Sequence, residues 1–167
     1  MPDPAPPTVI CNTSPLYYFH RIGCLDILWR LYGRITVTDA VIGELEAGRS
    51  YGVETPDPAA MSWVRRANPT RFAVPAMWPD LGPGECSVLL LALESTDPAL
   101  LILDDLLARR LAAWKRLRVT GTAGVLLSAK RQGILPALRP CLDKLVEIGF
   151  YLKKDVFDHI LELANEL

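Results

Sequence analysis

An unbroken apolar run at residues 100–103 ends on two adjacent carboxylates, Asp104 and Asp105. A run this short, without alternation, predicts a strand buried on both faces, as in a parallel sheet with helices above and below it. Residues 106–114 follow as a predicted helix. Because ligand sites in such sheets form just outside the carboxyl ends of the strands, chemistry is expected at this pair. A helix cap explains one carboxylate, and the second requires another role.

Strands and helices are predicted to alternate along the chain. Short apolar or β-branched runs predict strands at residues 8–11, 35–38, 72–74, 100–103 and 119–120. Periodicity and end signals predict helices at residues 16–31, 39–45, 59–66, 82–93, 106–114, 123–132, 135–148 and 155–167. This alternation is typical of βαβ units and predicts an α/β fold with a central parallel sheet of four to five strands.

The starts of two helices are predicted from capping residues. Ser14 is a favourable N-cap and Pro15 a favourable first helical residue. The helix that follows is interrupted by Gly23 and predicted to stop at Gly33. Asp39 is predicted to cap the next helix.

Length and composition predict a single domain over residues 1–167. The 50% apolar and 22% charged residues are typical of globular proteins. Residues 1–7 are proline-rich, which predicts a loose N-terminus, and they lack the basic and apolar regions of a signal peptide. No apolar run approaches the ~18 residues of a membrane span, so no membrane association is expected.

The four cysteines show neither a CxxC pattern nor the Cys/His spacing of a zinc site. Each lies in an apolar context, which predicts reduced core thiols in a cytoplasmic protein.

Two nucleotide-binding folds are also disfavoured. The first predicted strand is followed by NTSP in place of GxGxxG, and the glycine-rich residues 82–85 lack the lysine of a phosphate-binding loop.

Charge is distributed unevenly along the chain. Residues 106–144 contain nine Lys or Arg and one acid, a net charge of 9 − 1 = +8, so the remaining residues carry −1 − 8 = −9. Such asymmetry can attract a phosphate backbone. Solvated outer faces of three helices explain the same pattern equally well.

Polar residues recur where predicted strands end or the following helices begin: Asn12, Glu44, Glu85, Asp104, Asp105 and Thr122. Carboxylates converging at one edge repel one another unless a cation lies between them. Mg²⁺ or Mn²⁺ prefers such oxygen ligands and can activate water for phosphodiester cleavage. Each residue also has an ordinary structural role when it is considered alone. Glu85 in a first helical turn is favoured by the helix dipole, and Glu44 is explained by a solvated helix face. Asn12 is explained by hydrogen bonds to backbone groups in a turn. The metal hypothesis therefore depends on their joint placement.

The order of these motifs resembles the PIN domain. The resemblance is carried by NTSPL at 12–16, VIGEL at 41–45, Gly84-Glu85, and Leu103-Asp104-Asp105 followed by Ala108-Arg109. Residues 119–126 and 135–143 are similar, more narrowly, to an uncharacterised branch related to toxin ribonucleases of bacterial toxin–antitoxin pairs. The resemblance covers nearly the whole chain.

The resemblance implies a three-layer α/β/α sandwich with a metal-dependent ribonuclease site of three or four acids. Glu44, Glu85 and Asp105 match the family's acidic positions, and Asp104 is adjacent. Thr122 matches a polar position near the site. The catalytic and metal-binding prediction therefore rests on these acids, with Mg²⁺ or Mn²⁺ as the cofactor.

Asn12 departs from the family pattern, because many PIN domains have Asp at this position. Asn retains a carbonyl oxygen ligand but removes one negative charge, so lower metal affinity is expected. Contacts with RNA are predicted for Arg109, Arg110, Thr13 and Thr122.

The leading hypothesis is an RNA endonuclease, in line with the toxin resemblance, with an antitoxin as a partner. Asn12 favours a different hypothesis, a catalytically degenerate PIN-like module that binds RNA or protein without cleavage. A structural protein whose acids cap helices is the third hypothesis.

The predicted C-terminal helix carries an apolar stripe formed by Val156, Ile160, Leu163, Ala164 and Leu167. This stripe predicts that the helix packs on its own domain. A homodimer is also predicted.

Overall fold

The computed structural model describes residues 6–71, 75, 78 and 80–167. Its centre is an all-parallel sheet of five strands in the order β3-β2-β1-β4-β5. The strands are β1 (Thr8–Cys11), β2 (Ile35–Val37), β3 (Val64–Arg66), β4 (Ala99–Ile102) and β5 (Arg118–Thr120). The predicted α/β fold with a parallel sheet of four to five strands is therefore confirmed.

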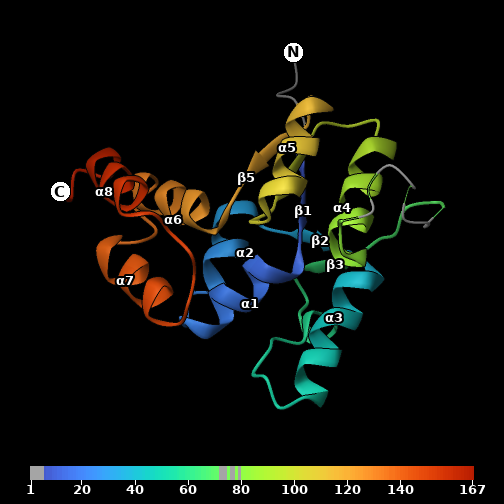
Figure 1. Ribbon diagram of the computed structural model, residues 1–167, viewed down its shortest axis with the longest axis horizontal. Coiled ribbons are helices and arrows are strands. Elements are labelled where there is room, and N and C mark those ends of the chain that lie inside the picture. Colours follow the sequence, from blue (N-terminus) through green and yellow to red (C-terminus); the bar gives the residue numbers. More distant parts are fainter. Residues whose placement is uncertain (1–5, 72–74, 76–77, 79) are drawn as a thin grey trace.

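Helices cover both faces of this sheet and form the three-layer sandwich that was expected (Figure 1). They are α1 (Thr13–Arg21), α2 (Asp26–Tyr32), α3 (Asp39–Ser50), α4 (Pro83–Glu94), α5 (Leu106–Trp114), α6 (Thr122–Arg131), α7 (Arg139–Glu147) and α8 (Lys154–Leu163). A 3-10 turn, η1 (Pro58–Ala60), precedes β3. On one face α4 packs on β1 and β4, and α5 packs on β5.

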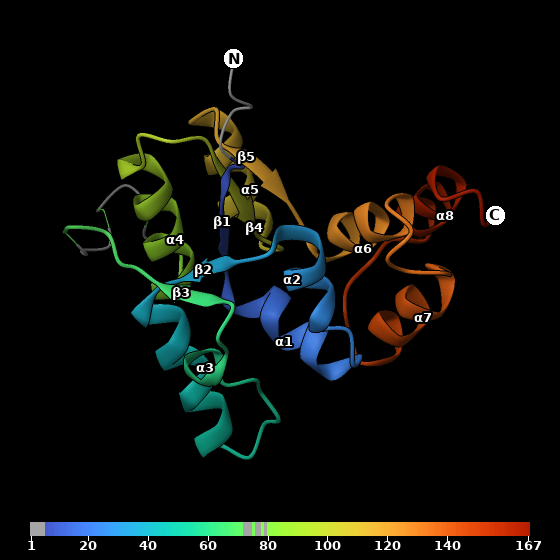
Figure 2. The same cartoon turned by 180° about the vertical axis from the view of Figure 1, so that it is seen from behind.

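The other face is covered by α1 and α2, which both contact α6. Helix α3 differs from these helices because it contacts both α1 and α4. It projects away from the sheet, as the reverse view shows (Figure 2). A residue on α3 can therefore meet side chains from the helix layers on both faces.

The core is centred on β1 and β4, the two inner strands. Ile10 and Leu101 pair across them and are at most 1% exposed. Leu103, directly after β4, is also fully buried. The unbroken apolar run thus has the buried environment that its composition predicted, and it holds the two aspartates at the edge of the core.

The helix predicted over 16–31 forms as two helices, α1 and α2, so the interruption predicted at Gly23 and the end predicted at Gly33 are both confirmed. Gly23 separates them with φ at 74°, a left-handed conformation that glycine adopts readily. The prediction of Ser14 as N-cap is wrong. The N-cap is Asn12, whose backbone is extended while Ser14 already lies inside the helix.

Asp39 does not cap α3, as had been expected. The N-cap is Thr38, whose side chain accepts a hydrogen bond from the Val41 N–H at 3.3 Å. Asp39 instead forms an ion pair with Arg66 on β3. The α3 helix also extends to Ser50, beyond the predicted range of 39–45.

The helix predicted at 59–66 is wrong, because β3 occupies its second half and pairs with β2 in parallel. Pairing with an existing strand satisfies backbone groups that the local sequence does not reveal. The strand predicted at 72–74 lies outside the described residues. The last helix ends at Leu163, earlier than predicted, and Asn165 just beyond it has φ at 56°.

Helix α8 packs on α6 through part of its predicted apolar stripe. Ile160 and Ala164 are buried, together with Leu161, which the predicted stripe did not include. Val156 and Leu163 remain 41% exposed. Within the ranges that the structure describes, no helix combines the length and apolar character needed to cross a membrane.

Candidate active site

The candidate residues lie at one edge of the sheet, where β1 and β4 end. These strands pair with Cys11 opposite Ile102, so the segments carrying Asn12 and Asp104 leave the sheet at the same edge. Helix α3 starts after the neighbouring strand β2 and carries Glu44 between α1 and α4. The topology therefore brings together residues that are far apart in the sequence.

Five residues form what we call the Glu44–Glu85 cluster: Asn12, Thr13, Glu44, Gly84 and Glu85. The Thr13 hydroxyl donates a hydrogen bond to Glu44 Oε2. The Gly84 N–H donates to Glu44 Oε1 at 2.8 Å, and Asn12 Nδ2 donates to Glu85 Oε1 at 3.2 Å. Both glutamates predicted as metal ligands are thus held by partners on other elements.

The close approach of Glu44 to α4 requires a glycine at position 84. A Cβ atom added to Gly84 would lie 2.5 Å from Glu44 Oε2 and 2.9 Å from its Cδ. These distances are far below van der Waals contact, so a larger residue would displace the carboxylate. The Gly84-Glu85 pair therefore positions Glu44 as well as supplying Glu85.

A buried hydroxyl pair that the sequence analysis missed joins α3 to α4. Thr38 Oγ1 and Ser87 Oγ are 2.6 Å apart, and the Ser87 hydroxyl also bonds the Gly84 carbonyl at 2.8 Å. Both side chains are at most 1% exposed. A serine directly before the apolar run at residues 88–93 of α4 was the signal that could have revealed this link.

Asn12 is the residue whose environment most suggests a ligand. It is 1% exposed, and its Oδ1 is the buried side-chain oxygen or nitrogen that lacks a hydrogen-bond partner among the described residues. Leaving a buried acceptor unsatisfied costs about 1–3 kcal/mol. A hard cation accepts such a carbonyl oxygen together with carboxylates. The oxygen atoms at this edge are therefore of the type that a hard divalent cation binds.

Asp104 forms a second group, the Asp104–Thr122 pair, with the start of α6. Its carboxylate accepts hydrogen bonds from the Thr122 N–H at 2.8 Å and the Thr122 hydroxyl at 2.6 Å. Burial raises the pKa of Asp104, while these bonds and the nearby Arg109 guanidinium oppose the rise. Thr122, which was predicted to contact RNA, is fully buried, and both of its donors bond Asp104.

The two adjacent aspartates have different environments. Asp105 is the N-cap of α5, and its exposed carboxylate accepts a hydrogen bond from the Ala108 N–H at 2.8 Å. Asp104 points to Thr122, the first residue of α6, which follows the end of β5. The structure therefore brings Asp104, rather than Asp105, into contact with another element of the edge.

Arg109 and Arg110 also differ. Arg109 is half-buried, and its guanidinium donates to the Leu103 carbonyl at 3.1 Å. A Cβ atom on Gly121 would lie 2.5 Å from this guanidinium, so Gly121 leaves the space that Arg109 occupies. Arg110 is exposed on α5. Of the two arginines predicted to bind RNA, Arg109 is therefore the one that lies beside an acid of the site, Asp104.

A cavity of about 610 Å³ opens beside Asp104 and Arg109 and extends to the connection between α7 and α8. That connection contributes Phe150, Tyr151 and Lys153 to the lining. Phe150 packs edge-on against Tyr18 with ring centroids 4.9 Å apart, which anchors the connection. Tyr151 is 81% exposed, so its ring is available to a ligand. The sequence analysis did not identify these residues.

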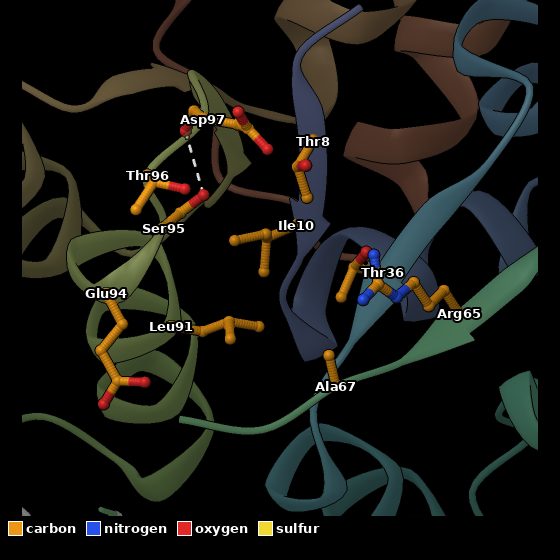
Figure 3. Close-up of a pocket in the computed structure, with 10 residues that line it drawn as sticks. All are labelled: Thr8, Ile10, Thr36, Arg65, Ala67, Leu91, Glu94, Ser95, Thr96 and Asp97. Carbon is orange, nitrogen blue, oxygen red and sulfur yellow. Dashed lines mark hydrogen bonds between the residues drawn. The ribbon is translucent and has the colours of Figure 1, made fainter. Parts of the chain in front are cut away.

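A separate cavity of about 300 Å³ lies away from the acids (Figure 3). Its lining includes Thr8, the first residue of β1, and residues 95–97, which precede β4. Figure 3 shows Ser95 and Asp97 beside Thr8, at the amino ends of these strands. This cavity therefore does not belong to the candidate active site.

The basic segment at 106–144 does not form one face at the acidic edge. Arg118 is the first residue of β5 and Arg116 precedes it, so both lie at the end of the strand opposite to Thr122. Lys130 pairs with Glu166 at 3.0 Å. Solvation and local pairing therefore explain several of these charges.

Comparison with known protein families identifies the fold. A family model described as DUF3368, PIN domain, matches residues 8–166. The chain belongs to this PIN-domain family. The match spans every strand and helix given above. In the same comparisons, no curated protein and no solved structure matched the chain.

In this PIN domain the acids form two groups rather than one. Across the described ranges, no three His, Cys, Asp or Glu side chains lie close enough together to hold a metal ion. The Glu44–Glu85 cluster supplies two carboxylates and the Asn12 carbonyl oxygen, and Asp104 faces Thr122. A shared metal ion would therefore require the side chain of Asp104 to reorient toward the cluster.

Proposed function

We propose that this PIN domain is a metal-dependent RNA endonuclease. Glu44, Glu85 and Asp104, with Asn12, would hold Mg²⁺ or Mn²⁺ through oxygen atoms. When bound, the metal ion would supply an activated water and positive charge opposite the phosphoryl group. The observation that carries the proposal is the buried, unpartnered Oδ1 of Asn12 next to the hydrogen bond with Glu85.

The chain's own residues orient this donor set. Thr13 and Gly84 hold the two oxygens of Glu44, and Asn12 holds one oxygen of Glu85. Holding ligands in place before the metal arrives lowers the conformational cost of binding. Asp105 caps α5, and we do not include it in the proposed metal-binding set.

The cavity beside Asp104 supports RNA as the substrate. It contains the Arg109 guanidinium, which suits a phosphate, and the exposed ring of Tyr151, which suits a stacked base. Lys153 adds a cation on the α7–α8 connection. We propose that single-stranded RNA follows this cavity from the acids toward α8, with Arg110 on its exposed margin.

A catalytically degenerate module is the alternative function, and one observation favours it. Each acid of the edge already accepts hydrogen bonds from the protein, and Asn12 supplies an amide where a carboxylate would add charge. Such a module would bind RNA or protein at the same edge without cleavage. Metal binding separates the two functions, because only the nuclease requires it.

Calorimetric titration with Mn²⁺ tests the proposal directly. We expect Glu44→Gln and Glu85→Gln to weaken binding by at least about 10-fold, the loss typical of disrupted metal sites. Glu46→Gln is the matched control, because Glu46 is an exposed glutamate on the same helix and its substitution changes the charge equally. Equal loss in all three variants would show that bulk charge, and not a site, attracts the ion.

Asp104→Asn and Asp105→Asn compare the two neighbouring aspartates. We expect weaker Mn²⁺ binding and slower cleavage of a single-stranded RNA only for Asp104→Asn. Binding lost through Asp105→Asn alone would assign the metal to the helix cap. Unchanged Mn²⁺ binding in every variant, with RNA still bound, would support the degenerate module.

A homodimer and an antitoxin-like protein are further proposed partners. The exposed side chains of Val156 and Leu163 on α8 offer apolar surface for such contacts. Light scattering over a range of concentrations tests the dimer. A monomer mass that persists at high micromolar concentration would exclude it.

A further inference from the structure

Two cysteines meet outside the candidate active site, where α7 approaches the connection between α1 and α2. The Sγ atoms of Cys24 and Cys141 are 3.8 Å apart, although the residues are 117 positions apart in the sequence. Cys24 lies between α1 and α2, and Cys141 lies in the first turn of α7. A disulfide requires an S–S distance of about 2.05 Å, so these thiols are free but need only a short approach.

The two thiols differ in accessibility and acidity. The hydrogen bond between the two thiols lowers the pKa of Cys24 to about 7, against the opposing effects of partial burial and Asp26. Lys144 lowers it further. Cys141 is 8% exposed, and its pKa is raised by its bond to Cys24 and by burial. Cys24 is therefore the partly exposed nucleophile, and Cys141 is the buried thiol in contact with it.

The other two cysteines have the opposite environment. Cys11 and Cys86 are fully buried, and burial raises the pKa of each. A buried thiol with a raised pKa is poorly reactive, because the thiolate is the nucleophile. They provide internal controls for the reactivity of the pair.

We propose that Cys24 and Cys141 are a redox-modification site at which a hydroperoxide forms a reversible disulfide. The Cys24 thiolate attacks the peroxide, an S–O bond forms, the O–O bond breaks, and an alcohol or water leaves with a proton. The sulfur is oxidised by two electrons to a sulfenic acid, and the peroxide is reduced.

The second step joins the two sulfurs. Cys141 attacks the sulfenic sulfur, the S–S bond forms, the S–O bond breaks, and hydroxide leaves as water with the Cys141 proton. Overall, two thiols and one hydroperoxide give one disulfide, one alcohol or water, and one water. A dithiol reductant reverses the reaction by thiol–disulfide exchange.

The bond would tie α7 to the first helices of the domain. Helix α7 leads into the connection that carries Phe150 and Tyr151, which line the cavity beside Asp104. A long covalently closed loop restricts the unfolded chain most strongly. The oxidised form should therefore unfold at a higher temperature than the reduced form.

Mass spectrometry of the full chain after treatment with hydrogen peroxide tests the proposal. We expect a mass loss of about 2 Da, reversed by dithiothreitol, and a cross-linked peptide pair that contains Cys24 and Cys141. Cys11 and Cys86 should remain free for alkylation after denaturation. The midpoint of thermal unfolding should rise by roughly 5 °C or more on oxidation.

Cys24→Ser and Cys141→Ser should each abolish both the mass loss and the rise in unfolding temperature. Peptide mapping of the unaltered chain decides the question even if a variant does not fold. The proposal is overturned if all four thiols stay reduced or if Cys24 gains oxygen without the cross-link. Disulfides only between molecules would also overturn it. None of these outcomes depends on nuclease activity or on metal binding.

Discussion

The Glu44–Glu85 cluster and the Asp104–Thr122 pair lie at the same edge of one sheet but are built differently. The cluster joins segments 31, 40 and 73 positions apart and leaves the Asn12 carbonyl oxygen without a partner. In the pair, both Asp104 oxygens accept hydrogen bonds from one residue 18 positions away. The first arrangement has capacity for a ligand, whereas the second is already satisfied by the protein.

This difference indicates how the candidate site would respond to substitution. Changes to Asp104 should alter folding stability as well as metal binding, because they leave the buried N–H and hydroxyl of Thr122 without an acceptor. Changes to the cluster should mainly alter metal binding. The predictions below test that division.

The largest effect on folding stability is expected for Asp104→Ala. Removal of the carboxylate leaves the buried N–H and hydroxyl of Thr122 unpaired, at a cost of about 1–3 kcal/mol. Asp105→Asn is the control and should change stability by only a few tenths of a kcal/mol, because Asn is an equally good N-cap. Urea unfolding measures both. Equal destabilisation would show that the cap, and not the pair, stabilises this edge.

Gly84→Ala should act on the cluster instead. The added Cβ would overlap the Glu44 carboxylate, so we expect Mn²⁺ affinity to fall by about 10-fold. Gly43→Ala is a matched control, because Gly43 lies on α3 and a Cβ there meets no atom within 4 Å. Calorimetry compares the two variants. Retained affinity in Gly84→Ala would mean that the position of Glu44 is unimportant for the ion.

Asn12→Asp should shift stability and metal binding in opposite directions. Without metal, a carboxylate next to Glu85 replaces a hydrogen bond by repulsion, so thermal stability should fall. With Mn²⁺, the added charge should tighten binding several-fold and increase any nuclease activity. Lower stability without tighter metal binding would show that Asn12 serves only the turn into α1.

The smallest expected effect is the pH dependence contributed by Asp104. Burial raises its folded-state pKa above 3.8, so its contribution to stability is fully present below that pH and is lost as pH rises through the folded pKa. Asp104→Asn should remove this loss. Unfolding at a series of pH values from acid to neutral measures this loss of stability. Identical profiles for the unaltered protein and Asp104→Asn would contradict the prediction.

Glu166 provides the comparison with opposite sign. Burial alone would raise its pKa, but hydrogen bonds from the Leu138 and Arg139 N–H groups and the Lys130 ammonium lower it from 4.5 to about 2. Its contribution is present above pH 4.5 and is lost as pH falls through about 2. Glu166→Gln should therefore flatten the acid side of the same profile.

Much of the fold could be predicted from local pattern. The buried strand before Asp104, the helix at Leu106–Trp114, and the alternation that produces a parallel sheet all follow from hydrophobicity and period. The sequence also predicted that Glu44, Glu85, Asp104 and Asp105 lie at one edge, because strand ends and helix starts in parallel sheets share an edge. Their role in binding metal stays a prediction. These features depend on residues that are neighbours in the sequence.

The tertiary structure decided the features that depend on partners distant in sequence. Strand β3 exists because β2 offers backbone groups to pair with, although its own residues gave no strand signal. Asp104 turns to Thr122 while Asp105 caps α5, a division that two identical adjacent side chains cannot encode by themselves. The contact between Cys24 and Cys141 likewise depends on how α7 packs against the first helices. Side-chain orientation follows from the three-dimensional positions of donors and acceptors, which the linear pattern does not specify.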